Sequence, residues 1–247
     1  MPPGKQLQNL ATRLGSCMFS YGRRRAIPFD QTIRAVAGQK PPLAFIRSTR
    51  LPLVWFPAIL PPMMTLLVGT NRPGSNTRKI ANHVEEIYRE LKVPLKTLDL
   101  ANLPAEIFHP SSYAAKPSGF KTFSDGILQA EGLVVVTPEY NGSVPGILKY
   151  FIDMLKFPES FDRRPVCFVG LGAGMWGALR PVEQLQAIFG YRNAYNYPER
   201  VFMPHVNDLL NETGRLNNPE LIQRLKEQAT GFVEFVEKLK GTKLRHV

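Results

Sequence analysis

The chain has 247 residues, of which 44% are hydrophobic, and a formal net charge of +11. This length and hydrophobic fraction suit one large domain with a real core, with or without an appendage. The charge is uneven, because residues 1–62 carry nine Lys and Arg and one acid, Asp30, whereas residues 63–247 carry 22 basic and 19 acidic residues. The body is nearly neutral and has no basic stripe with interleaved aromatic residues, so we expect no nucleic-acid partner.

Residues 1–62 form a basic, proline-containing leader with no steady hydrophobic period. The uncharged run 51–70 has the length of a membrane span, but four prolines interrupt it, so we expect no spanning helix. An Arg-rich leader with few acids is typical of transit peptides, and a twin-arginine export signal is a second interpretation, although the apolar run lies far behind the arginines. The alternative is that Met63 or Met64 is the native start and that residues 1–62 are untranslated or disordered.

Cysteine and histidine usage argues against disulfides and metals. Cys17 and Cys167 cannot build a disulfide framework, and this low count fits a reducing compartment, so we expect a cytoplasmic protein. The four histidines are scattered, and none has the spacing of a metal ligand.

Residues 63–247 alternate short apolar runs with helical periods, which indicates one α/β domain. Strands are predicted at 64–69, 95–100, 133–137, 165–170 and 200–203. Helices are predicted at 76–91, 120–130, 144–156, 177–189 and 219–239. Five strand–helix units in succession favour a doubly wound parallel sheet with helices on both faces. The order 2-1-3-4-5 would bring the ends of the first and third strands together at the switch point, where such sheets bind ligands.

The loop after the first predicted strand reads GTNRPGSNT over residues 69–77. It brings three hydroxyls, two Asn and one Arg directly before a helix, whose free N–H groups and partial positive charge suit a phosphate. Gly69 and Gly74 have the spacing of a nucleoside-triphosphate loop, but Ser75 and Asn76 stand where that loop needs Lys and a hydroxyl residue. The alternative is an ordinary turn with Ser75 or Asn76 as the N-cap. We favour a phosphate site.

The loop after the third predicted strand reads TPEYNGSVPG over residues 137–146. It places Glu139 and Tyr140 beside the pair Asn141-Gly142, which allows unusual backbone directions. A loop at the carboxyl end of a buried strand is where α/β proteins bind ligands. Ser143 is predicted to N-cap the next helix, which would leave the other polar groups of the loop available.

The loop after the fourth predicted strand contains a formal GxGxxG from Gly172 to Gly177. The dinucleotide fingerprint belongs to the first strand–helix turn and needs an acid at the end of the next strand, which is missing here. We interpret these glycines as allowing close backbone approach to a flat ligand. The alternative is a glycine-rich turn with Trp176 packed on the sheet.

Three segments together resemble the NADPH-dependent FMN reductase family of flavodoxin-like proteins: GTNRPGSNT at 69–77, PEYNGSVPG at 138–146 and GAGMWGALRPVEQL at 172–185. The resemblance covers about residues 64–240. It implies that the FMN phosphate is held by Thr70, Arg72, Ser75, Asn76 and Thr77. It also implies that the isoalloxazine ring is bordered by Pro138, Glu139, Tyr140 and Asn141, and on its other edge by Gly172, Ala173 and Gly174. Many relatives have Ser or Thr at 172 or 173, so only backbone donors are expected there.

The activity implied by the resemblance is hydride transfer from a nicotinamide nucleotide through FMN to a small electrophile, such as a quinone, azo compound, flavin or oxyanion. No acid–base side chain is required, and Glu139 and His109 are weak candidates. One alternative is a flavodoxin-like electron carrier, although carriers that dock to basic partners are often acidic and this body is slightly basic. Another is a flavin-binding sensor attached through its leader to a partner or membrane surface. The physiological acceptor and the choice between NADPH and NADH stay open.

A homodimer or homotetramer is also expected, since the family commonly forms dimers or dimers of dimers. The helix predicted at 144–156 and the residue after it carry more large apolar residues than one core stripe requires, namely Tyr150, Phe151, Met154 and Phe157. The alternative is that these side chains are buried within the monomer.

Overall fold

The computed structural model describes residues 61–240, all of which belong to one compact unit. The interpretations given above for the leader concern residues that lie outside the described range, apart from Pro61 and Pro62. No helix within residues 61–240 is long and apolar enough to cross a membrane.

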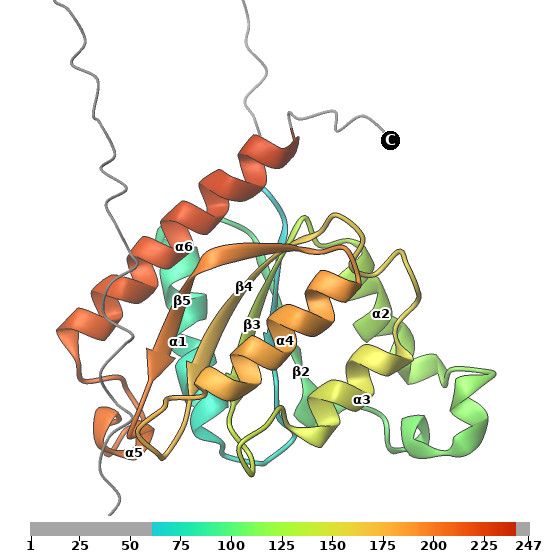
Figure 1. Ribbon diagram of the computed structural model, residues 1–247, viewed down its shortest axis with the longest axis horizontal. Helices are drawn as coiled ribbons and strands as arrows, with labels where there is room; N and C mark the ends of the chain where they lie inside the picture. Colours follow the sequence, from blue (N-terminus) through green and yellow to red (C-terminus); the bar gives the residue numbers. More distant parts are fainter. Residues whose placement is uncertain (1–60, 241–247) are drawn as a thin grey trace, which may run out of the picture. The chain divides into compact units, whose positions relative to one another are not determined.

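Five parallel strands form one sheet in the order β2-β1-β3-β4-β5, which confirms the predicted topology (Figure 1). They are β1 (Met64–Val68), β2 (Leu95–Asp99), β3 (Gly132–Pro138), β4 (Pro165–Leu171) and β5 (Tyr195–Met203). Every residue of β1, β3 and β4 is buried, as expected for strands that helices cover on both faces. In the edge strand β2 only Leu98 is buried, and its other four residues are half-buried.

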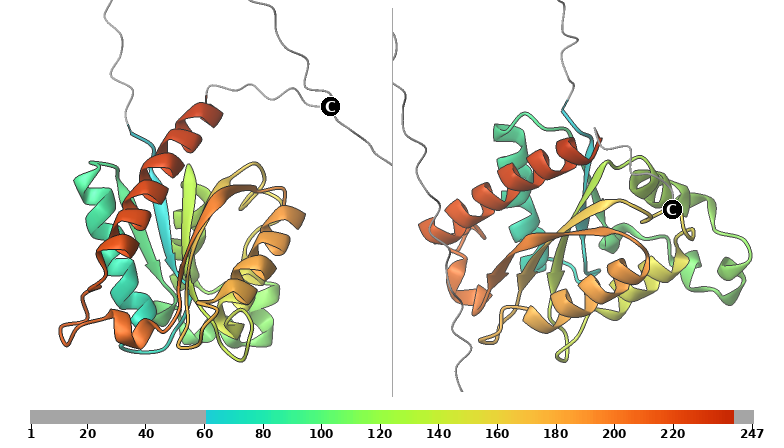
Figure 2. Two further views of the ribbon diagram at one scale, coloured as in Figure 1. Left: turned by 60° about the vertical axis from the view of Figure 1, so that its left-hand side comes forward. Right: turned by 45° about the horizontal axis from the view of Figure 1, so that its top comes forward.

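Helices cover both faces of the sheet, as predicted (Figure 2). On one face lie α1 (Asn76–Glu90) and α6 (Pro219–Lys240), and on the other lie α2 (Lys121–Leu128), α3 (Gly146–Met154) and α4 (Leu179–Tyr191). Each face has its own hydrophobic cluster, because successive residues of a strand point to opposite sides. Leu66 and Val134 belong to the α1 and α6 side, whereas Leu67 and Val135 belong to the other.

Three elements differ from the prediction. β5 begins at Tyr195, five residues earlier than expected, and its register against β4 shifts between Val166 and Phe168. The polar and proline-containing start of this edge strand hides it from a hydrophobicity pattern. Residues 101–118, for which no helix or strand was predicted, lie in a region that folds into four short 3-10 helices. A one-turn helix, α5 (Val206–Leu209), follows β5 and was not predicted.

Candidate functional site

Three loops meet at the carboxyl edge of the sheet, at the lower end of the strands in Figure 1. They follow β1, β3 and β4, which are neighbours in the sheet, so the topology brings together residues 69–75, 139–145 and 172–178. These are the loops that carry all twelve predicted cofactor residues apart from Asn76 and Thr77, which begin α1, and Pro138, which ends β3. We call them the phosphate loop, the ring loop and the glycine loop.

The phosphate loop approaches β3 closely and then opens the helix α1. A Cβ on Gly69 would lie 2.8 Å from the carbonyl oxygen of Val136, so only glycine fits there. Gly74 has φ +64°, and Ser75 caps the helix by accepting a hydrogen bond from the backbone N–H of Arg78 at 3.2 Å. The predicted cap is therefore confirmed at Ser75. The first turn of α1 holds no acidic residue, so its free N–H groups face no competing carboxylate of that turn.

Thr70 joins the phosphate loop to the ring loop. Its side chain is buried, and its hydroxyl lies 2.8 Å from the hydroxyl of Tyr140. The same Thr70 oxygen accepts the backbone N–H of Arg72 at 3.2 Å. Two of the predicted phosphate residues and one predicted ring residue therefore share a hydrogen-bonded chain, whereas the side chain of Arg72 itself is exposed.

Asn76 has a more restricted role than its sequence position suggests. Its side-chain Nδ2 donates to Oδ1 of Asn207 at 2.8 Å, and its Oδ1 accepts from Nζ of Lys79 at 3.3 Å. The amide is hydrogen-bonded at both ends, which orients it, and the backbone N–H and the second Nδ2 hydrogen are the donors that Asn76 can offer to an anion. Thr77, the next residue, is buried. Sequence reasoning missed both Lys79 and Asn207, since neither belongs to a motif.

The ring loop is a tight two-residue turn. Asn141 and Gly142 have φ values of +50° and +72°, and Tyr140 and Ser143 exchange backbone hydrogen bonds of 3.1 and 3.0 Å. Positive φ at both central residues defines a type I′ turn, the conformation that Asn-Gly favours. The unusual backbone directions predicted for this pair are therefore confirmed.

Ser143 does not cap the next helix, so that prediction was wrong. The residue before α3 is Pro145, which has no capping side chain, and the Ser143 hydroxyl instead donates to Oε1 of Gln184 at 2.8 Å. The backbone N–H of Val144 donates to the same oxygen at 3.1 Å. Gln184 lies on α4, so a side chain distant in sequence competes for the hydroxyl and ties the ring loop to α4.

A second link between these two elements is ionic. Arg180, at the start of α4, donates to Oε1 of Glu139 at 3.1 Å, and its guanidinium lies 5.7 Å from the ring centroid of Trp176. The Glu139 carboxylate is thus held as an ion-pair partner. Arg180 and Trp176 lie inside the resemblance segment, yet the contact of Arg180 with the ring loop depends on tertiary structure.

The glycine loop presents backbone to the outside. Gly177 has φ +54°, and a Cβ there would lie 2.7 Å from the nitrogen of Pro204, so this turn requires glycine. A Cβ on Gly174 would meet no atom within 4 Å, so the loop surface is open at this point. Trp176 is 51% exposed, and the alternative in which it packs on the sheet was wrong.

Two further groups of the described residues that could carry chemistry are Cys167 and His109. Cys167 is buried in β4, and burial raises the pKa of its thiol, so the reactive thiolate is disfavoured. His109 lies in the 3-10 region and bonds through Nδ1 to the Ser111 hydroxyl at 2.7 Å. No group of three or more His, Cys, Asp or Glu within residues 61–240 could hold a metal ion.

The three loops fit a flavin mononucleotide in their chemistry. Hydroxyls at a helix N-terminus without acidic residues suit its phosphate, and an open backbone surface at Gly174 suits a flat ring. The cavities found along β2 and beside the 3-10 turns, which include Thr97 and Phe108 respectively, lie at other places. The FMN site is therefore assigned to the three polar loops, which contain hydroxyls, amides and open glycines.

The strand order and the ligand edge between β1 and β3 define a flavodoxin-like α/β protein. Residues 62–208 match the NADPH-dependent FMN reductase family, and the chain belongs to that family. It is therefore an oxidoreductase whose cofactor is FMN and whose co-substrate is a nicotinamide nucleotide.

Comparison with individual proteins gives the same class. The chain is 29% identical over 178 residues to a quinone reductase of Escherichia coli (strain K12). The matched region covers 70% of this chain and 95% of that protein. It is 28% identical to an NADH:(hydroxy)cinnamate reductase subunit of Vibrio ruber, over 69% of this chain and 85% of that protein. The solved structure of the NAD(P)H:(acceptor) oxidoreductase FerB from Paracoccus denitrificans has the same fold, with a TM-score of 0.61 at 21% identity over 72% of this chain and 98% of that one.

Proposed function

We propose that this chain is a quinone-type reductase that transfers reducing equivalents from a nicotinamide nucleotide to a small electrophile. The observation that carries the proposal is the hydrogen-bonded junction of Thr70 and Tyr140 between the phosphate and ring loops, in a chain of the FMN reductase family. The chemistry that the cofactor supplies is hydride transfer between nucleotide and acceptor. The protein supplies binding, orientation and the local electrostatics.

The phosphate end of the site is proposed to consist of Thr70, Arg72, Ser75, Asn76 and Thr77. Arg72 would add a cation whose planar fork matches a phosphate, and its exposure leaves it able to turn toward one. Asn76 would act through its backbone N–H at the start of α1, while its side chain is held in place by Asn207 and Lys79. Ser75 would act mainly by setting the start of α1.

The ring end of the site is proposed to consist of Pro138, Glu139, Tyr140 and Asn141 on one side and Gly172, Ala173 and Gly174 on the other. Tyr140 is fixed through its hydroxyl to Thr70, so its ring would form a wall of fixed orientation. Glu139 would keep its ion pair with Arg180, and we assign it no proton transfer. The exposed residues Ala173 and Gly174 leave room for a stacked nicotinamide or acceptor.

We propose a quinone as the first acceptor to test, because the Escherichia coli relative is named a quinone reductase. Cinnamates, azo compounds, free flavins and oxyanions such as chromate form the comparison set, the first because of the Vibrio ruber relative. NADPH and NADH are both to be compared, since the family description names NADPH and that relative's name contains NADH.

The test is to purify the chain, reconstitute it with FMN and follow nicotinamide oxidation at saturating quinone. We expect a yellow protein whose NAD(P)H turnover depends on both FMN and quinone. A protein that binds FMN but shows no turnover with any acceptor of the set would favour the electron carrier. A colourless protein that does not bind added FMN would contradict the proposal.

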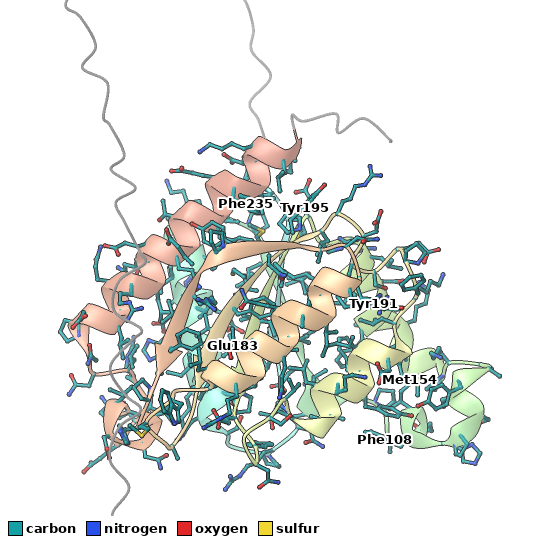
Figure 3. The ribbon with its side chains drawn as sticks, in the orientation of Figure 1. Phe108, Met154, Glu183, Tyr191, Tyr195 and Phe235 are labelled. Atoms are coloured by element: carbon teal, nitrogen blue, oxygen red, sulfur yellow. The ribbon has the colours of Figure 1, made fainter. Side chains whose placement is uncertain are left out.

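A cytoplasmic location and a homodimer or homotetramer remain predictions. The large apolar side chains of the helix predicted at 144–156 give less support for an oligomer, because Phe151 and Met154 are buried within the monomer (Met154 is labelled in Figure 3). The surface still carries large exposed side chains at Phe157, which is 62% exposed, and at Tyr191, which is 79% exposed at the end of α4 (Figure 3). Light scattering that shows only monomer would contradict the oligomer.

A further inference from the structure

The segment between β5 and α6 contacts the glycine loop and the start of α1, the helix that follows the phosphate loop. We call residues 204–217, which include α5, the α5 segment. Its backbone holds the glycine loop, since the N–H groups of His205 and Val206 donate to the carbonyl oxygens of Gly174 and Gly172 at 3.3 and 3.0 Å. None of the motifs described above includes this segment.

On its other side the α5 segment reaches the start of α1. Asn207, the second residue of α5, accepts the hydrogen bond from Nδ2 of Asn76 at 2.8 Å. The direction of this bond is fixed by Lys79, because an ammonium group can only donate and therefore requires the Asn76 oxygen on its own side. Asn76 is thus held between Lys79 and Asn207 in one orientation.

The far end of the α5 segment is fastened to the middle of α1. The backbone N–H of Leu216 donates to Nε2 of His83 at 2.6 Å, and Arg215 pairs with Glu86 at 3.0 Å. A bridge between Leu210 and Leu216 closes the segment on itself. The α5 segment therefore connects α1 to the glycine loop through hydrogen bonds at both of its ends.

We propose that Asn207 is a positioning residue for the FMN phosphate, which it serves by holding Asn76, the first residue of α1. The inference rests on the proposed phosphate site. Through this contact the backbone N–H groups at the start of α1 keep their direction, whereas the glycine loop is held separately by the backbone of His205 and Val206. Asn207 does not contact the phosphate in this proposal.

The test compares FMN with riboflavin, which has the same ring and no phosphate, by fluorescence titration of the full chain. Asn207→Ala is expected to raise the Kd for FMN about 3- to 10-fold, the effect of one hydrogen bond, and to leave the Kd for riboflavin unchanged. The matched control is Asn217→Ala, since Asn217 is an exposed residue of the same segment whose side chain makes no hydrogen bond to the described residues. This control should change neither Kd.

A double-mutant cycle gives a second readout. If Asn207 acts through Asn76, then Asn76→Ala and the double variant should have the same FMN Kd. The positioning role would be overturned by an unchanged FMN Kd in Asn207→Ala, or by an equal loss of affinity for FMN and riboflavin. The melting temperature of the apoprotein shows whether a variant has lost structure in general.

The same titrations test the proposed phosphate site separately from the role of Asn207. Wild type that binds FMN and riboflavin equally well, with no change in Arg72→Ala, would refute the phosphate site itself. Discrimination that is lost in Arg72→Ala but kept in Asn207→Ala would retain the phosphate site and refute the role of Asn207.

Discussion

The two ends of the sheet use their polar groups in opposite ways. At the amino end, Arg164 donates to the carbonyl oxygens of Leu128, Ala130, Glu159 and Ser160, which closes the end of α2 and the turn before β4. At the carboxyl end, the loops are joined by single links such as Thr70 to Tyr140 and Glu139 to Arg180. The amino end thus gathers several carbonyl groups around one cation, although the buried Ser160 Oγ and Arg192 Nε have no hydrogen-bond partner there, whereas the loops at the carboxyl end are held by single contacts.

Arg192 repeats the pattern at the amino end. Its Nη2 donates to the carbonyl oxygen of Lys156 at 2.7 Å, and its guanidinium lies 4.9 Å from the ring centroids of both Phe157 and Phe161. Burial lowers the pKa of Arg164 and of Arg192, because desolvation disfavours the charged form of each guanidinium. Both arginines therefore link chain segments at the end of the sheet opposite to the proposed site.

The comparison is tested most strongly by removing Arg164. Arg164→Ala leaves several carbonyl groups at the amino end without their donor, so we expect a loss of about 3 kcal/mol in the free energy of unfolding. Urea denaturation measures it. The matched control is Arg224→Ala, since Arg224 is an exposed residue of α6 whose side chain makes no hydrogen bond or ion pair to the described residues, and it should cost less than about 1 kcal/mol. Equal effects in the two variants would contradict the assigned role of Arg164.

At the carboxyl end, the corresponding change should affect ligand binding more than stability. Thr70→Val removes the hydroxyl that joins two loops, and we expect the FMN Kd to rise about tenfold. Thr65→Val is the control, because the buried Thr65 hydroxyl donates to the carbonyl of Gly126 away from the site. It should lower stability by about 1 kcal/mol and keep FMN affinity. If Thr65→Val lowered FMN affinity and Thr70→Val lowered only stability, the roles assigned to the two threonines would be contradicted.

A smaller effect is expected from pH, through His83 on α1. Burial lowers the pKa of His83 from its usual 6.5, opposed by Glu86 and assisted by Arg215. Below about pH 6.5 the unfolded chain binds a proton that the folded chain does not, so stability is full above this pH and is lost as pH falls toward the folded pKa. Urea unfolding of wild type and His83→Gln between about pH 7.5 and 5 measures it. A wild-type profile parallel to that of the variant would contradict this role.

The smallest effect is expected at the Glu139 to Arg180 pair, which is partly exposed and screened by water. Glu139→Gln should change the free energy of unfolding by less than about 1 kcal/mol. Because the pair holds the ring loop, affinity for FMN and riboflavin should fall by the same factor, about twofold. Asp153→Asn, which breaks a similar exposed pair with Lys149 on α3, is the matched control. If Glu139→Gln lost affinity for FMN but not for riboflavin, Glu139 would be assigned to the phosphate end of the site.

Much of the fold was predictable because its strands are covered on both faces. β1, β3 and β4 are continuous apolar runs, and such runs allow few topologies once helices alternate with them. β5 was predicted only in its last residues, since its polar start and Pro198 resemble a loop in sequence. The one-turn helix α5 is too short to show a period.

The site was predictable as loops and less so as contacts. Positive φ at Asn141 and Gly142 follows from the residue types themselves. The failed cap at Ser143 depends on Gln184, which lies 41 positions away, and no local pattern encodes such a competition. The bond from Asn76 to Asn207 spans 131 positions and was missed for the same reason.

The exposed tip of the glycine loop has a consequence for engineering the acceptor range. Met175 is 66% exposed, and the described structure shows no hydrogen bond from its side chain or from that of Trp176. The ring loop, in contrast, is fastened through Thr70, Gln184 and Arg180, so a substitution there disturbs its neighbours. A library confined to position 175 would reshape the rim beside the proposed ring site and leave the anchoring of the other two loops intact, whereas the ring of Trp176 contacts Arg180.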